Sequence, residues 1–165
     1  MRLSAIPAVL FLSASINWAH EGDVARLGDH APCVRCTTTD GIALSTNGLH
    51  GQVVLLIFFS LQSEPSMREL EFVERDLCSP VRPGLVTIVV GLDQGEKQLA
   101  DLTAAKHRIF RIVADPKRQL YDQYATEDVP RTYVIGKDGV IKYASIGFDE
   151  WEIDRIKAAA EAALR

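Results

Sequence analysis

Two cysteines near the N-terminus have the spacing of a reactive or metal-binding pair. Cys33 and Cys36 form a Cys-x-x-Cys motif, which occurs in thiol–disulfide centres, structural disulfides and zinc sites. Thr37 follows the motif in place of a histidine, so covalent haem attachment is not indicated. In a regular strand the two Cα atoms would lie about 10 Å apart, beyond the roughly 4.4–6.8 Å that a disulfide spans. A Cys33–Cys36 bond therefore requires a turn in this segment.

A third cysteine, Cys78, leaves the pairing open. Three thiols allow three different single bridges, each of which leaves one thiol free. The sequence is compatible with a structural disulfide or inert buried thiols, with a redox pair at Cys33 and Cys36, and with a cysteine-rich metal site. Zinc takes four ligands, and no further Cys or His stands at a recognised spacing. We therefore expect no bound metal and no other cofactor.

The composition sets the class of protein. The chain has 165 residues, one domain's worth, with 47% apolar and 24% charged residues, which is typical of a globular protein and not of a disordered one. Its 18 Lys and Arg against 22 Asp and Glu give a formal net charge of −4, and no basic run is present. Nucleic acid is therefore not an expected partner, because phosphate binding requires clustered positive charge.

The N-terminal residues have the layout of an export signal. Met1 and Arg2 make a positive start, residues 3–16 are apolar apart from serines and one proline, and Ala19 suits a cleavage site. This stretch is short for a bilayer span of about 20 residues. We expect a signal peptide at 1–19, a linker at 20–29 and one domain at 30–165, in an exported, periplasmic or extracellular protein. The alternative is an uncleaved N-terminal anchor, and we expect no other contact with a membrane.

The elements that position these residues follow from hydrophobic periodicity and turn residues. Unbroken apolar runs predict strands buried on both faces, and apolar spacing of three and four residues predicts helices. Strands are expected at 53–59, 85–92 and 109–114, and helices at 65–77, 95–107 and 117–124.

Two hairpins and a closing helix complete the prediction. Residues 33–38 and 42–45 flank an Asp-Gly turn, and residues 131–135 and 140–146 flank a Gly-Lys-Asp-Gly turn. The last helix is expected from Asp149 to Leu164, with Glu152 completing a capping box. Strands alternating with helices, followed by a hairpin and a helix, predict an α/β fold with a mixed sheet.

Three landmarks in this order resemble the thioredoxin fold, and in particular its exported TlpA/ResA-type branch of redoxin or AhpC/TSA-like proteins. They are residues 28–32 with 40–41 and 49–52, residues 53–66, and residues 129–135 with 137–139 and 147. The resemblance extends from Gly28 to the C-terminus. It implies a central mixed β-sheet flanked by helices, an added N-terminal hairpin, and thiol–disulfide exchange as the activity.

Serines replace the reactive centre of that family. Its members carry Cys-x-x-Cys where a strand meets a helix, and those positions match Ser63 and Ser66, with the intervening Glu64 and Pro65 as in ResA-type proteins. A helix N-terminus lowers the pKa of a thiol, but a serine hydroxyl there stays protonated and forms no reducible bond. We expect Ser63 to act as an N-cap and expect no catalytic residue at these four positions. The same replacement removes a peroxidatic thiol.

The resemblance further implies that Pro130, after Val129, is a cis-proline beside a groove that holds extended chains. Two functions remain in competition. The first is a binding, scaffold or redox-accessory role, in which that groove holds an extended segment of a partner protein. The alternative is a thiol–disulfide oxidoreductase that works through Cys33 and Cys36.

Overall fold

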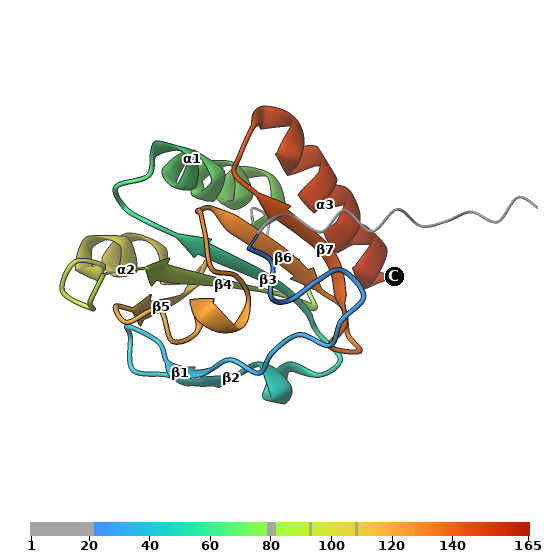
Figure 1. Cartoon of the computed structure of the whole chain (residues 1–165), viewed down its shortest axis with the longest axis horizontal. Helices are drawn as coiled ribbons and strands as arrows, with labels where there is room; N and C mark the ends of the chain where they lie inside the picture. The colour runs from blue at the N-terminus through green and yellow to red at the C-terminus, as the bar shows by residue number, and fades with distance from the viewer. Residues whose placement is uncertain (1–21, 79–81, 93, 108) are drawn as a thin grey trace, which may run out of the picture.

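A five-stranded sheet runs through the middle of the molecule in the order β5-β4-β3-β6-β7 (Figure 1). The computed structural model describes residues 22–78, 82–92, 94–107 and 109–165, so the predicted signal peptide lies outside the described residues. The strands are β3 (Val53–Phe59), β4 (Leu85–Leu92), β5 (Arg111–Asp115), β6 (Arg131–Ile135) and β7 (Ile141–Ile146). The pairs β3–β4 and β4–β5 are parallel, whereas β3–β6 and β6–β7 are antiparallel.

Strand β3 lies at the centre because all seven of its side chains are apolar. Val54, Leu56 and Phe58 face one core cluster, and the alternate residues of the strand face the other. Such a run is favourable only where both faces of the strand are covered. The predicted fold class and this central strand are confirmed.

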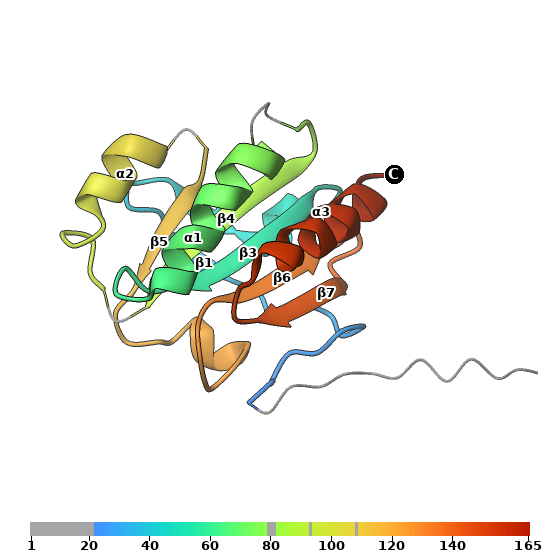
Figure 2. The same ribbon diagram turned by 90° about the horizontal axis from the view of Figure 1, so that it is seen from above.

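Helices α1 and α3 cover one face of the sheet (Figure 2). Helix α1 (Glu64–Val73) continues into a single π-helical turn, η2 (Glu74–Cys78), and α3 spans Glu150–Leu164. Asp149 caps α3 by accepting a hydrogen bond from the Glu152 N–H at 2.9 Å, as the capping pattern predicts. The short helix α2 (Ala100–Lys106) lies beside β5.

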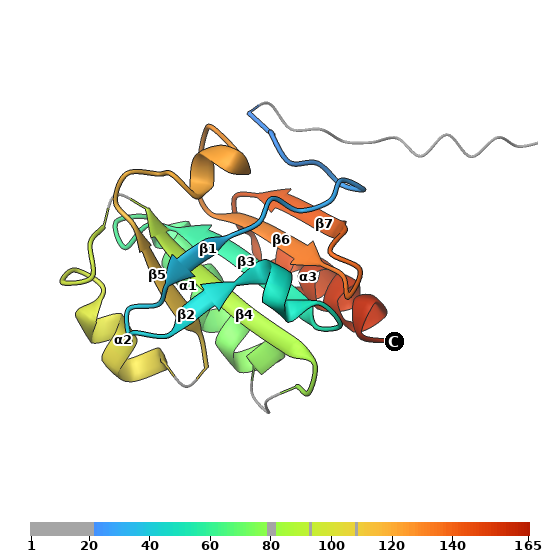
Figure 3. The ribbon, with the colours of Figure 1, turned by 90° about the horizontal axis from the view of Figure 1, so that it is seen from below.

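The opposite face is covered by the predicted N-terminal hairpin and by two 3₁₀ turns (Figure 3). The hairpin consists of β1 (Arg35–Thr37) and β2 (Ala43–Ser45), and the turns are η1 (Thr46–Leu49) and η3 (Tyr121–Gln123). Under them Phe58 contacts Tyr121, Tyr124 and Tyr133, with ring centroids 5.2–6.3 Å apart.

Two helices are shorter than predicted. The segment expected to be helical over 95–107 begins as a turn, in which the Gln98 side chain accepts a hydrogen bond from the Gly95 N–H at 2.8 Å. Leu99 ends this turn and packs against Gly91, where a Cβ atom would lie 3.0 Å from both Leu99 methyl groups. The predicted helix at 117–124 is reduced to η3.

Part of the predicted linker is attached to the domain. The backbone N–H groups of Val24 and Ala25 both donate to the Tyr124 carbonyl, at 3.1 and 3.0 Å. Asp23 forms a buried ion pair with Arg131 at the start of β6. The segment from residue 22 onward therefore packs on the loop that leads into β6, and it supports the candidate site described next.

Candidate functional site

Ser63 and Ser66 lie where β3 leads into α1, at the positions that the sequence analysis matched to the family's cysteines. Ser63 is extended, and its Oγ accepts a hydrogen bond from the Ser66 N–H at 3.3 Å. Glu64 and Pro65 occupy the first turn of the helix, where an acidic side chain and a proline are both favourable. Ser63 therefore caps the helix, as predicted, and satisfies one of its free N–H groups.

Ser66 is fully buried, and its hydroxyl has no hydrogen-bond partner among the residues that the structure describes. An unpaired buried hydroxyl costs about 1–3 kcal/mol, whereas a thiol at the same place would need no partner. The position thus suits a small side chain with little need for hydrogen bonding. Within the described chain no histidine forms a hydrogen bond with Ser63 or Ser66, so neither serine is activated as a nucleophile by such a base.

Pro130 lies at the same edge of the sheet. Phe58 pairs with Arg131, so the end of β3 and the residues just before β6 are neighbours. The Val129–Pro130 peptide bond is cis, and the Pro130 carbonyl accepts a hydrogen bond from the Gly147 N–H at 2.9 Å. We call residues 63–66, Val129 and Pro130 the α1–β6 corner.

The backbone of Val129 is available for pairing. Neither its N–H nor its C=O forms a hydrogen bond to any residue that the structure describes. Val129 is half-buried and lies two residues before the first residue of strand β6. An unpaired N–H and C=O beside a strand can form main-chain hydrogen bonds to an added extended chain.

Glu69 is a buried carboxyl group that the sequence analysis missed. It lies one helical turn after Ser66 and accepts a hydrogen bond from the hydroxyl of Thr132 in β6, which links α1 to the strand that follows Pro130. Its second oxygen has no partner among the described residues. The pKa of Glu69 is raised to about 8, chiefly by burial and in part by the charge of Glu152, against the lowering effect of the Thr132 hydrogen bond.

We expect this carboxyl group to make stability fall as pH rises. The folded state holds the Glu69 proton more tightly than the unfolded chain, whose pKa is 4.5, so its stabilising contribution is complete below pH 4.5 and is lost towards pH 8. The difference between the folded and unfolded pKa of Glu69 corresponds to a loss of at most about 4–5 kcal/mol in the free energy of unfolding. Urea unfolding between pH 5 and 9 should show this loss in the natural protein and not in Glu69→Gln.

Glu64→Gln is the matched control because Glu64 is an exposed acid on the same helix. It should keep the pH profile of the natural protein. Parallel profiles for the natural protein and Glu69→Gln would contradict the assignment.

The structure separates Cys33 from Cys36. Both are free thiols. Val34 and Cys36 pack in the same core cluster, whereas the Cys33 Sγ lies 3.7 Å from the Ser45 hydroxyl. The segment is thus extended, and the two thiols point to opposite sides of it, without the turn that a bond between them requires.

The two thiols also differ in acidity. Burial raises the pKa of Cys33, but hydrogen bonds from Arg35, Ser45 and the Asn47 backbone outweigh it, so the pKa lies below its ordinary value. Burial and the charge of Asp115 raise the pKa of Cys36 to about 11. Cys33 is therefore the more reactive thiol of the two.

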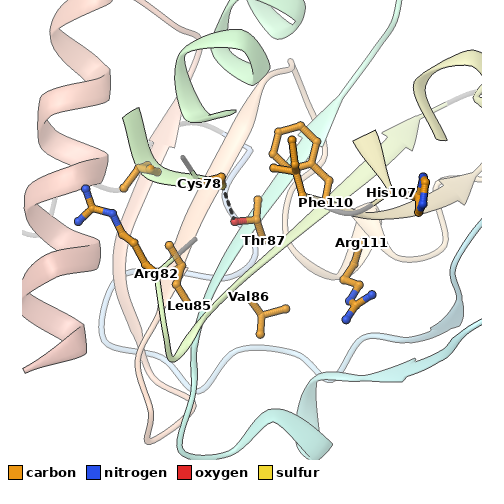
Figure 4. A pocket seen from close by; sticks show the side chains of 10 residues that line it. Cys78, Arg82, Leu85, Val86, Thr87, His107, Phe110 and Arg111 are labelled. Atoms are coloured by element: carbon orange, nitrogen blue, oxygen red, sulfur yellow. Dashed lines mark hydrogen bonds between the residues drawn. The ribbon is translucent and has the colours of Figure 1, made fainter. Parts of the chain in front are cut away.

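Cys78 lies apart from both, at the other end of α1. Its Sγ is 3.3 Å from the Thr87 hydroxyl, on the wall of a cavity of about 170 Å³ (Figure 4). Burial raises the pKa of Cys78. Within the described chain, no three His, Cys, Asp or Glu side chains are grouped so as to hold a metal ion. None of its helices has the length and apolar character that a bilayer crossing requires.

The mixed sheet, with helices on one face and the N-terminal hairpin on the other, and the corner define a thioredoxin-like protein, and solved structures share this fold. A protein from Chlorobium tepidum, provisionally assigned as the thiol:disulfide interchange protein DsbE, matches with a TM-score of 0.76 and 21% identity over 86% of this chain and 99% of that one. StoA from Bacillus subtilis matches with a TM-score of 0.63 and 21% identity over 78% of this chain and 96% of that one. These likenesses concern the fold alone.

Residues 27–144 match the AhpC/TSA family, and the chain belongs to it. The thiol-disulfide oxidoreductase ResA from Bacillus subtilis (strain 168) is 23% identical over 114 residues, which are 69% of this chain and 64% of that protein. The chain therefore spans less than two thirds of the length of this curated relative. Together these matches confirm the resemblance to TlpA/ResA-type redoxins.

Proposed function

We propose that this protein is an exported thioredoxin-fold binding protein that holds an extended segment of a partner at the α1–β6 corner and performs no dithiol chemistry there. The observation that carries this proposal is that the Ser63 oxygen caps the N-terminus of α1, at the position that the family resemblance assigns to a reactive thiol. The unpaired Val129 backbone supplies the means of binding. Export rests on the signal pattern of residues 1–19.

Binding is tested with fluorescein-labelled peptides that are short, unstructured and matched in length, and that are rich in lysine, glutamate or serine. At least one should raise its fluorescence polarisation on addition of the full chain. Methylation of alternate backbone nitrogens in that peptide should weaken binding about tenfold, because each lost main-chain hydrogen bond is worth about 1 kcal/mol. Failure of every peptide to bind would contradict the proposed function.

A second candidate function is thiol–disulfide exchange through the N-terminal cysteines. The lowered pKa of Cys33 favours it, whereas the separation of Cys33 from Cys36 removes the resolving thiol that a dithiol cycle needs. A thiol count under native and reducing conditions distinguishes the two functions. A reversible pair would support the enzyme, and inert thiols would support the binding protein.

We expect no measurable insulin-disulfide reduction by the full chain at neutral pH, because Ser63 and Ser66 cannot cycle between thiol and disulfide. The matched variant changes both Cys33 and Cys36 to Ser and should behave identically. Turnover above the no-protein background in that variant would show a reductase centre elsewhere. Turnover in the natural chain alone would instead support the second candidate.

A further inference from the structure

Four exposed carboxylates surround the α1–β6 corner, and we call them the acidic rim. Glu64 lies in the first turn of α1, Glu127 and Asp128 directly precede Val129, and Asp149 caps α3. The β3–β6 pairing and the hydrogen bond between Gly147 and Pro130 bring these segments to one edge of the sheet. A segment that pairs with Val129 would therefore lie next to Glu127 and Asp128, at the same edge of the sheet as Glu64 and Asp149.

The arginines closest in sequence to the rim already have partners. Arg68 pairs with Glu150 at 3.0 Å, and Arg155 pairs with Glu152 at 3.2 Å. Arg131 is buried and pairs with Asp23. Arg68, Arg155 and Arg131 each pair with a carboxylate outside the rim, and the four rim carboxylates give this surface a negative charge.

An exposed indole adjoins the rim. Trp151 lies in the first turn of α3, two residues after Asp149, and its side chain is 75% exposed. A single exposed apolar residue is ordinary on a protein surface. An indole among carboxylates is different, because its face attracts a Lys or Arg cation that the carboxylates also attract.

Three basic residues line the cavity at the opposite edge of the sheet. There Arg82, His107 and Arg111 line the cavity beside Cys78, at the starts of β4 and β5 (Figure 4). Arg111 is exposed, whereas Arg82 is paired with Glu161 at 2.8 Å. The carboxylates of the acidic rim therefore attract a basic chain to the edge that carries Val129.

We propose that the partner segment held at this corner is basic, with Lys or Arg side chains that contact Glu64, Asp128 and the face of Trp151 while its backbone pairs with Val129. This inference rests on the proposed function. Main-chain pairing accepts any sequence, so the rim and the indole supply the selectivity.

The test compares the lysine-, glutamate- and serine-rich peptides by fluorescence polarisation with the full chain. The lysine-rich peptide should bind at least about tenfold more tightly than the serine-rich one, and raising the salt concentration should reduce this preference. The double variant Glu64→Gln, Asp128→Asn should lose most of the preference, and Trp151→Ala should weaken the lysine-rich peptide about threefold to tenfold.

Glu71→Gln is the matched control, since Glu71 is an exposed acid two turns further along α1, and it should leave the preference unchanged. Serine- or glutamate-rich peptides that bind as tightly as the lysine-rich one would overturn this inference and leave the proposed function standing. Absence of binding by all three would overturn both. An unchanged preference in the Glu64→Gln, Asp128→Asn variant, with its fold retained by circular dichroism, would overturn the role of the rim.

Discussion

The double variant Ser63→Cys, Ser66→Cys should form a reversible disulfide and reduce insulin disulfides, an activity that the natural chain is expected to lack. The Ser63 oxygen already reaches the Ser66 backbone at 3.3 Å, so side chains at these positions are close in space. A thiol at position 63 would meet the free N–H groups of the helix start, which favour the thiolate. The buried position 66 accepts a thiol readily, because the present hydroxyl has no partner among the described residues.

The measurement is the insulin turnover of the double variant and its reduction potential in a glutathione buffer. Activity should rise from background to a rate limited by thiol exchange. Each single-cysteine variant should show no cycle, because it lacks a resolving thiol. Replacing Pro130 by a bulky residue in the double variant should lower the activity again, since Pro130 lies at the same sheet edge.

A pair that never oxidises in a folded double variant would refute the match between this helix start and the family's reactive centre. The proposed binding function would then lose the observation that carries it. Circular dichroism of the variant shows whether the fold is retained.

Ile57→Asp should unfold the protein at room temperature. Ile57 is fully buried at the centre of β3, where it pairs with Val89 on one side and Thr132 on the other. A carboxylate there would be buried without a partner, at a cost of several kcal/mol. Typical domain stability is about 5–15 kcal/mol, so most or all of it is lost.

Thermal unfolding followed by circular dichroism measures this effect. Ile57→Val is the matched control, and it should cost only about 0.5–1.5 kcal/mol because it removes one methylene from the same site. A melting temperature of Ile57→Asp equal to that of the natural protein would mean that this strand is not central.

The local elements of this protein are encoded in short stretches of sequence. The apolar run of β3 has no favourable place except between two covered faces, and its burial was predictable for that reason. The caps at Ser63 and Asp149 were equally predictable, because capping depends on a side chain and an N–H only three residues away. The family resemblance added the order of the elements.

Long-range packing decided what the sequence left open. Glu69 precedes the apolar residue Leu70, and that position at the border of the helix's apolar face is the only signal that the sequence holds for its burial. Its pKa depends on Thr132 and Glu152, which are distant in sequence and are brought near by β6 and α3. Periodicity within one segment carries no information about such neighbours.

The cysteines and the corner show the same division. The Cys-x-x-Cys spacing of Cys33 and Cys36 allowed a disulfide, and the alternation of an extended strand suggested that they diverge. Only the packing of Cys36 into the core shows that the two thiols diverge.

Likewise, the serines at 63 and 66 by themselves determined that this helix start cannot carry dithiol chemistry. The unpaired backbone of Val129 and the acidic rim around it were decided by tertiary structure, because both arise where β3, β6 and α3 meet, from segments that lie far apart along the chain.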